Sequence, residues 1–141
     1  MTHTIHDIGV ASHIGRYSDA IEAKPNLRWL MTSGTPGLSV GGDLPKDITG
    51  QAELAWQHVI GLLEKADMTV ADIVKITQYL TRGDDIAAYA KVRSRFLGQV
   101  RPASMLLVIP QLHLFLRDLA FKPFNIGRFW SCVGQVVILQ H

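Results

Sequence analysis

The spacing of apolar residues changes between residues 73 and 109, and this change most constrains the fold. Residues 73–80 are rich in β-branched and aromatic side chains, which is typical of a strand. From Ile86 to Leu97 the apolar residues recur at three- and four-residue steps, as on one face of a helix. Ser104–Ile109 is then a nearly continuous apolar run, which predicts a strand buried on both faces.

An earlier segment has the same helical spacing over a longer stretch. Apolar residues recur at three- and four-residue steps from Ala52 to Leu63, and Asp47 and Thr49 are both candidate N-caps. The pattern predicts a helix over residues 48–66.

The residues before this helix predict extended structure. Arg28–Thr32 is aromatic and apolar, as in a strand, and the turn-forming residues 33–37 follow it. Leu38–Val40 then resumes an extended pattern, so a hairpin or two short strands are expected. The order of elements predicts the α+β class (α/β with a mixed sheet), a single domain with two helices packed on one sheet.

Length and charge narrow the class of protein. The chain has 141 residues, of which 48% are apolar, so it is long enough to bury one core. Its net charge of +2 includes no basic run of five residues, which argues against a nucleic-acid partner. No apolar stretch approaches the ~18 residues of a membrane span, so no membrane association is expected. The single Cys132 forms no internal disulfide, and the first residues do not resemble a secretory signal, so we expect a cytoplasmic protein.

Two segments indicate a small-molecule pocket. In Ile14–Ile21 a tyrosine, Tyr17, follows shortly after Gly15. After the strand at 28–32, Ser33 and Gly34 form a small-residue loop whose backbone amides are suited to hold an anion or oxyanion. The six histidines lack the paired spacing of a zinc site, so no metal is expected.

Four motifs carry a resemblance to a known family. Ile14–Ile21, Thr32–Gly34, Asp72–Lys75 and Arg101–Ser104 resemble the reactive-intermediate deaminase (Rid, YjgF-type) family in order and spacing, from about residue 7 to residue 112. The resemblance implies a chorismate-mutase-like fold and a homotrimer with small-molecule sites between subunits. It also implies hydrolysis of 2-imino or 2-enamino acids to 2-keto acids and ammonia, without a metal or organic cofactor.

The resemblance assigns roles to individual residues. Tyr17 matches the family's pocket tyrosine, although a tyrosine that only anchors the turn fits the sequence about equally well. Ser33 and Gly34 match the loop whose backbone contacts the substrate, against the alternative that Gly34 only makes a turn.

The chain departs from the family pattern at the carboxylate-binding arginine. Ser104 stands where archetypal members place this arginine in the strand after Pro-Ala, and a serine supplies neither its charge nor its bidentate fork. We assign Ser104 to the catalytic pocket with Tyr17. Arg16 and Arg101 are alternative sources of a substrate-binding cation. Ala90 also replaces a polar amide residue of the family.

The C-terminal tail is a further departure. In the family a glutamate in the last strand holds the attacking water, whereas Asp118 lies about two residues before the expected position. We therefore divide the chain into a Rid-like core, residues 1–112, and an atypical tail, residues 113–141. The tail is either a replaced last strand or a segment read out of frame, and Gly134–Leu139 has the composition of a late strand.

Two functions follow from these observations. The first is a cofactor-free hydrolytic deaminase of small 2-imino or 2-enamino acids. The second is a trimer of the same fold that binds a small molecule without catalysis, which the Ser104 and Ala90 departures favour. Older family names refer to translation inhibition or endoribonuclease activity, but the sequence has no basic and aromatic stripe for single-stranded RNA, so this function ranks last.

Overall fold

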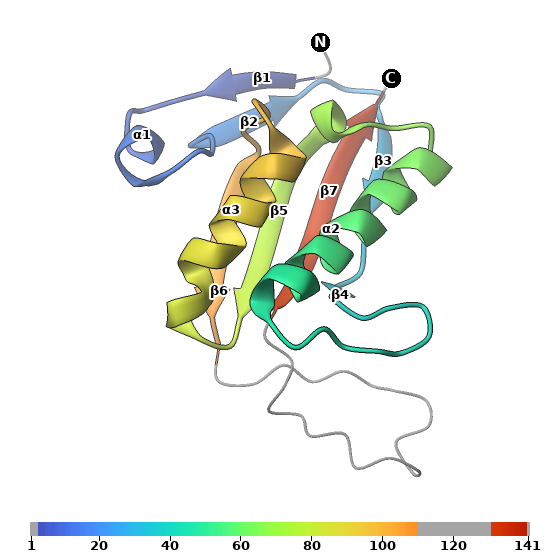
Figure 1. Cartoon of the computed structure of the whole chain (residues 1–141). Coiled ribbons are helices and arrows are strands. Elements are labelled where there is room, and N and C mark those ends of the chain that lie inside the picture. The colour runs from blue at the N-terminus through green and yellow to red at the C-terminus, as the bar shows by residue number, and fades with distance from the viewer. Residues whose placement is uncertain (1–2, 110–130, 141) are drawn as a thin grey trace.

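The computed structural model describes residues 3–109 and 131–140 of the chain. A five-stranded sheet carries two helices on one face, and its main strands lie in the order β3, β7, β5, β6 (Figure 1). The elements of this sheet and its helices are β3 (Arg28–Met31), β4 (Thr35–Pro36), α2 (Ile48–Lys65), β5 (Ile73–Leu80), α3 (Ile86–Leu97), β6 (Ala103–Val108) and β7 (Ser131–Gln140). This architecture confirms the predicted mixed sheet with two packed helices.

The two helices and the central strands follow the sequence pattern closely. The predicted helices match α2 and α3, and β5 matches the predicted strand at 73–80. Asp47 is the N-cap of α2, because its Oδ1 accepts a 2.7 Å hydrogen bond from the Gly50 N–H, whereas Thr49 lies inside the helix. Short 3₁₀ turns, η1 (Val70–Asp72) and η2 (Gly83–Asp85), precede β5 and α3.

Of the two alternatives expected for residues 28–40, the hairpin is wrong and the two short strands are confirmed, although β4 lies at Thr35–Pro36 instead of at 38–40. Residues 38–40 are not a strand, and β3 and β4 do not pair with each other. Both pair antiparallel with β7, with Met31 opposite Val137 and Thr35 opposite Val133. Because the partner strand lies about a hundred residues away in the chain, no local pattern at residues 28–40 reveals it. The predicted late strand at 134–139 falls within β7.

A separate hairpin precedes the main sheet and was not predicted. Strands β1 (His3–His6) and β2 (Ala20–Ala23) pair antiparallel, and the connection between them contains the short helix α1 (Ala11–Ile14). Ser18 attaches this segment to the start of β6, because its N–H donates to the Pro102 carbonyl at 3.3 Å.

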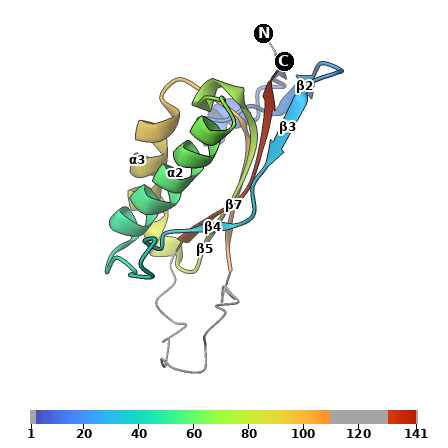
Figure 2. The same cartoon turned by 90° about the vertical axis from the view of Figure 1, so that its right-hand side faces the viewer.

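The prediction that β6 is buried on both faces is wrong for the described part of a single chain. The strand pairs in parallel with β5 on one side, and on the other side the described residues give it a single bridge, between Ser18 and Ala103. Leu106 packs against the core, but Met105 and Leu107 point to the opposite face and are 56% and 39% exposed. None of the described helices covers the sheet face opposite α2 and α3, as Figure 2 shows from the side. The apolar run is thus consistent with a second covering that the described residues of one chain do not provide.

The core lies between the helices and the sheet. Trp56 of α2 is fully buried and stacks on Phe96 of α3, with ring centroids 6.0 Å apart and planes 16° apart. The other fully or nearly fully buried apolar side chains come from α2, α3 and β5: Ala52, Ala55, Val59, Leu63, Ile73, Ile76, Leu80, Tyr89 and Val92. Among the described residues, no helix combines the length and the hydropathy that crossing a membrane requires.

Replacing Gly61 with alanine is expected to stabilise the protein by about 0.5–1 kcal/mol. Gly61 lies within α2, and a Cβ added there meets no atom within 4 Å, so the gain in helix propensity carries no steric cost. Urea unfolding followed by circular dichroism measures the change. A midpoint equal to or below that of the parent would contradict the helix packing described above.

Candidate functional site at the edge strand β6

Ser104 is the centre of a polar cluster on the helix-facing side of β6. It lies two residues before Leu106, which packs on the core, so the alternation of the strand directs Ser104 toward α3. Its Oγ accepts a 2.7 Å hydrogen bond from Nε2 of Gln78 on the neighbouring strand β5. The cluster therefore joins β5 and β6 on the face of the sheet that the helices cover.

Tyr89 of α3 fixes the orientation of the Gln78 amide. The Tyr89 hydroxyl donates to Gln78 Oε1 at 3.1 Å, and Gln78 Nε2 also donates to the Met105 carbonyl at 3.0 Å. Both Gln78 and Tyr89 are 1% exposed. With the acceptor end held by a hydroxyl and the donor end by a carbonyl, the amide presents an N–H to Ser104.

Arg93 places a cation against the same serine. It lies one helical turn after Tyr89, on the same face of α3, and its Nη2 donates to Ser104 Oγ at 3.2 Å and to the Arg16 carbonyl at 3.5 Å. The guanidinium is half-buried, and its Nε is buried without a hydrogen-bond partner in the described part of the chain.

Burial lowers the pKa of the Arg93 guanidinium, and nearby Tyr89 partly opposes this effect. The side chain stays charged near neutral pH, because arginine does not lose its proton in proteins. The ion pairs among residues 3–109 and 131–140 are His6–Glu22, Arg82–Asp84 and Arg95–Glu53, so none neutralises Arg93. The cluster is positively charged, and that charge is partly removed from water.

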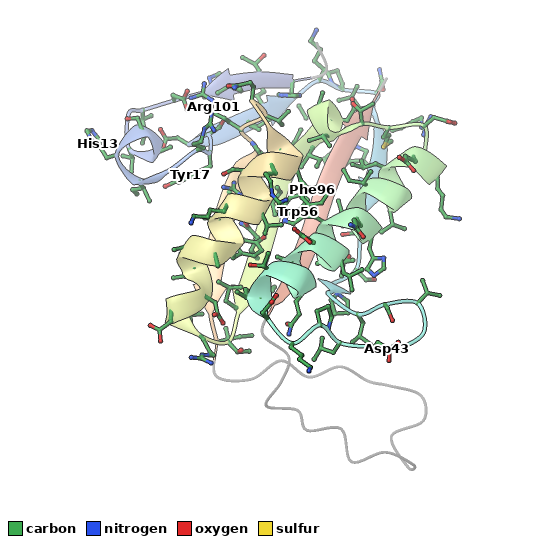
Figure 3. All side chains as sticks on the ribbon, viewed as in Figure 1. His13, Tyr17, Asp43, Trp56, Phe96 and Arg101 are labelled. Carbon is green, nitrogen blue, oxygen red and sulfur yellow. The ribbon has the colours of Figure 1, made fainter. Side chains whose placement is uncertain are left out.

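Three of the residues assigned from the sequence lie beside this cluster. Tyr17 is half-buried in the connection before β2, and Arg101 is exposed immediately before β6 (Figure 3). The Ser18 hydroxyl donates to the Arg101 carbonyl, which links these two segments. Arg16 is exposed, and its Nη2 reaches Gln99 Oε1 at 3.5 Å. The structure therefore places Arg16, Tyr17, Arg101 and Ser104 at one edge of the sheet.

Ser33 and Gly34 lie at the other edge. Both are exposed in the connection from β3 to β4, and β7 and β5 separate β3 from β6. At about 4.8 Å for each of three steps between strands, the two edges are roughly 14 Å apart. A single chain thus does not bring Ser33 and Gly34 together with Tyr17 and Ser104.

Sequence reasoning missed the groups that surround Ser104. Gln78 is a polar residue at an inward position between Ile76 and Leu80, and this interruption of an apolar alternation was the available signal. Arg93 falls within the predicted helix at 86–97, where no local pattern distinguishes it. Ala90 is exposed and lines a groove along α3 that includes none of the cluster residues. Asp118 lies outside the described residues.

Within the described residues, no group of three or more histidine, cysteine, aspartate or glutamate side chains is placed to hold a metal ion. The chemistry available at the β6 edge is therefore that of hydroxyls, an amide and guanidinium groups. These groups donate hydrogen bonds and stabilise negative charge, which suits a small anionic ligand.

Comparison with known proteins identifies the family to which this chain belongs. The family model described as endoribonuclease L-PSP matches residues 9–117. The chain belongs to this family, the Rid/YjgF-type family.

Individual relatives agree with this assignment. A RutC family protein of Haemophilus influenzae is 37% identical over 100 residues, which cover 70% of this chain and 75% of that protein. TdcF of Escherichia coli, named as a candidate reactive intermediate deaminase, is 31% identical over 71 residues, 50% of this chain and 55% of that protein.

Solved structures share the fold. YyfB of Yersinia pestis, described as a Rid family protein, superposes with a TM-score of 0.76 at 18% identity and covers 98% of both chains. The Escherichia coli yjgF gene product gives a TM-score of 0.66 at 20% identity, with 91% of each chain covered. The structure of Escherichia coli TdcF with bound serine gives 0.66 at 20% identity and covers 89% of this chain and 94% of that one.

Proposed function

We propose that the protein is a homotrimeric, cofactor-free deaminase that hydrolyses small 2-imino or 2-enamino acids to 2-keto acids and ammonia. The observation that carries the proposal is the cationic, hydrogen-bonding cluster around Ser104 at an open sheet edge, in a chain of the Rid/YjgF-type family. The candidate reactive intermediate deaminase TdcF among the relatives supports the reaction class. The proposed location is the cytoplasm.

The bare face of the sheet supports assembly. Trp29 and Met31 of β3 are 62% and 60% exposed there, and Met105 and Leu107 of β6 are exposed on the same face. Large apolar side chains gathered on one face of a soluble domain commonly mark an interface. In the proposed trimer these faces pack together.

Packing of this kind completes the site. The β6 edge of one subunit would lie beside the β3 edge of the next, because the two edges lie on opposite sides of each sheet. Tyr17 and Ser104 of one subunit would then share a cleft with Ser33 and Gly34 of its neighbour. The proposed cleft thus lies where the β6 edge of one subunit meets the β3 edge of the next.

The proposed reaction adds water to the C2 carbon of the imine. Water forms a new C–O bond, and the resulting carbinolamine loses ammonia as its C–N bond breaks, which leaves the keto acid. The Ser33–Gly34 backbone amides would orient the substrate, and the Tyr17 hydroxyl would hydrogen-bond the reacting nitrogen or oxygen. The family resemblance implies the role of Tyr17, and the experiment below tests it.

Purified protein of known oligomeric mass is expected to release ammonia and 2-oxobutanoate from 2-iminobutanoate generated in situ. Tyr17→Phe keeps the ring and removes the hydroxyl, so we expect kcat to fall by about 100-fold if the hydroxyl transfers a proton. Tyr79→Phe, a similarly half-buried tyrosine on β5, is the control and should retain activity. Equal rates for Tyr17→Phe and the parent would remove Tyr17 from the reaction.

The alternative function is a trimer that binds a small molecule without catalysis. Ser104 favours it, because the arginine that the family resemblance implies at this position is absent. A folded trimer that binds 2-oxobutanoate and releases no ammonia above the buffer rate would support this alternative and refute the deaminase.

The proposed division of the chain is a core over residues 1–112 and a tail over 113–141. Sequencing of the coding DNA separates the two origins proposed for the tail. A family-like last strand encoded in another reading frame would identify a frame change, and its absence would support a replaced strand.

A further inference from the structure

The charge of Arg93 has no acidic counterpart in the described part of the chain. Its guanidinium is half-buried and contacts a hydroxyl and a carbonyl, and its Nε is buried without an acceptor. A desolvated cation without a carboxylate is destabilising in the free protein. An anionic ligand would supply the missing negative charge.

The Ser104 hydroxyl is arranged to donate to such a ligand. Both of its contacts among the described residues are with donors, Nε2 of Gln78 and Nη2 of Arg93. These donors occupy the two oxygen lone pairs, so the hydroxyl proton is left for an acceptor outside the cluster. Tyr89 holds the Gln78 amide in this orientation, and the arrangement is therefore preorganised.

We infer that Arg93 and Ser104 together bind the carboxylate of the ligand, an assignment that rests on the proposed function. The cation comes from helix α3 instead of from strand β6. Arg93 is the specificity-determining residue that selects 2-imino and 2-keto acids over their uncharged analogues. Ser104 donates the second hydrogen bond to the same carboxylate.

Arg16 and Arg101 are weaker candidates for this role. Both side chains are exposed, so water screens their charges, and the side chain of Arg16 is directed to Gln99 at 3.5 Å. Arg93 is the guanidinium that touches Ser104 directly. An ion pair gains strength as its surroundings lose water, which favours the half-buried group.

Calorimetric binding tests this assignment without requiring turnover. The probe is 2-oxobutanoate, the keto acid of the proposed reaction, and 2-oxobutanamide is its uncharged analogue. The parent should bind the acid at least about tenfold more tightly than the amide, because a charge-assisted pair contributes more than a neutral hydrogen bond. Equal affinities for acid and amide, or no binding of the acid, would overturn the inference.

Substitution of Arg93 then locates the cation. Arg93→Met keeps the aliphatic stem of the side chain. It should weaken binding of the acid by at least about tenfold and leave binding of the amide unchanged. Arg95→Met is the matched control, since Arg95 is exposed on the same helix and pairs with Glu53. Unchanged acid binding in Arg93→Met, or a loss confined to Arg16→Met or Arg101→Met, would overturn the inference.

Moving the cation gives a second test that does not depend on one variant. Ser104→Arg combined with Arg93→Met leaves one cation at the same place and should restore acid binding above that of Arg93→Met. If the double variant bound the acid no more tightly than folded Arg93→Met does, a shared carboxylate position would be contradicted.

The two proposals fail in different ways. Arg93-dependent binding of 2-oxobutanoate without ammonia release refutes the deaminase and leaves the carboxylate site standing. Ammonia release that is the same in the parent and in Arg93→Met, at subsaturating substrate, refutes the carboxylate site and leaves the deaminase standing.

Discussion

Replacing Trp56 with alanine is expected to lower the free energy of unfolding by about 3–5 kcal/mol. The side chain is fully buried between α2 and the sheet, and its ring stacks on Phe96 of α3. Alanine would leave a cavity where α2, α3 and β5 meet, because the surrounding backbone elements cannot close fully over it. Urea unfolding at one fixed protein concentration, followed by circular dichroism, measures the loss.

Trp56→Phe is the matched control for this substitution. The indole Nε1 is buried without a hydrogen-bond partner among the described residues, so phenylalanine removes no hydrogen bond and keeps most of the apolar surface. Its cost should be well below that of alanine. Similar losses for the two variants would show that the ring does not fill the core as described.

The second large effect is expected at Gly37, where replacement by alanine should destabilise the protein by about 1–3 kcal/mol or more. A Cβ added there would lie 2.1 Å from the backbone oxygen of Gln51 and 2.6 Å from its carbonyl carbon. That oxygen belongs to helix α2, so neither side can move without disturbing the helix or the connection from β4. The same unfolding measurement applies.

Gly41→Ala is the control within the same connection. An added Cβ there meets Asp43 at 3.6 Å and Ser39 at 3.8 Å, which are ordinary contacts, so little change is expected. Gly37→Ala should also displace the neighbouring Ser33–Gly34 loop and reduce activity. If Gly37→Ala proved as stable as Gly41→Ala, the close approach of this connection to α2 would be refuted.

The elements that could be predicted are those whose pattern is local. Helices α2 and α3 and strand β5 bury a continuous face, and their periodicity therefore marks them in the sequence. Strands β3 and β4 take their partner from β7, about a hundred residues later, and this pairing leaves no local signal. The apolar residues of β6 misled the burial prediction, because nothing in the described part of the chain buries Met105 and Leu107 on its outer face.

The candidate site likewise has residues that the sequence could indicate and residues that only the fold reveals. Tyr17, Ser33, Gly34 and Ser104 could be selected from motifs, but their distribution over two sheet edges appears only in the fold. Arg93 could not be singled out, because an arginine within a helical pattern usually covers a solvated face. Its importance depends on contact with Ser104 and on burial, neither of which the sequence states.

The central claim is a deaminase site shared between two subunits, and a mixed trimer tests it most directly. Tyr17→Ala would disable the β6 half and Gly34→Trp the β3 half, so each variant alone should be inactive. Co-expressed and purified through two different tags, they should recover about a third of the parental ammonia release, because each mixed trimer has one interface of three in which both halves are intact. Mixed trimers as inactive as either variant alone would contradict a site built from two chains.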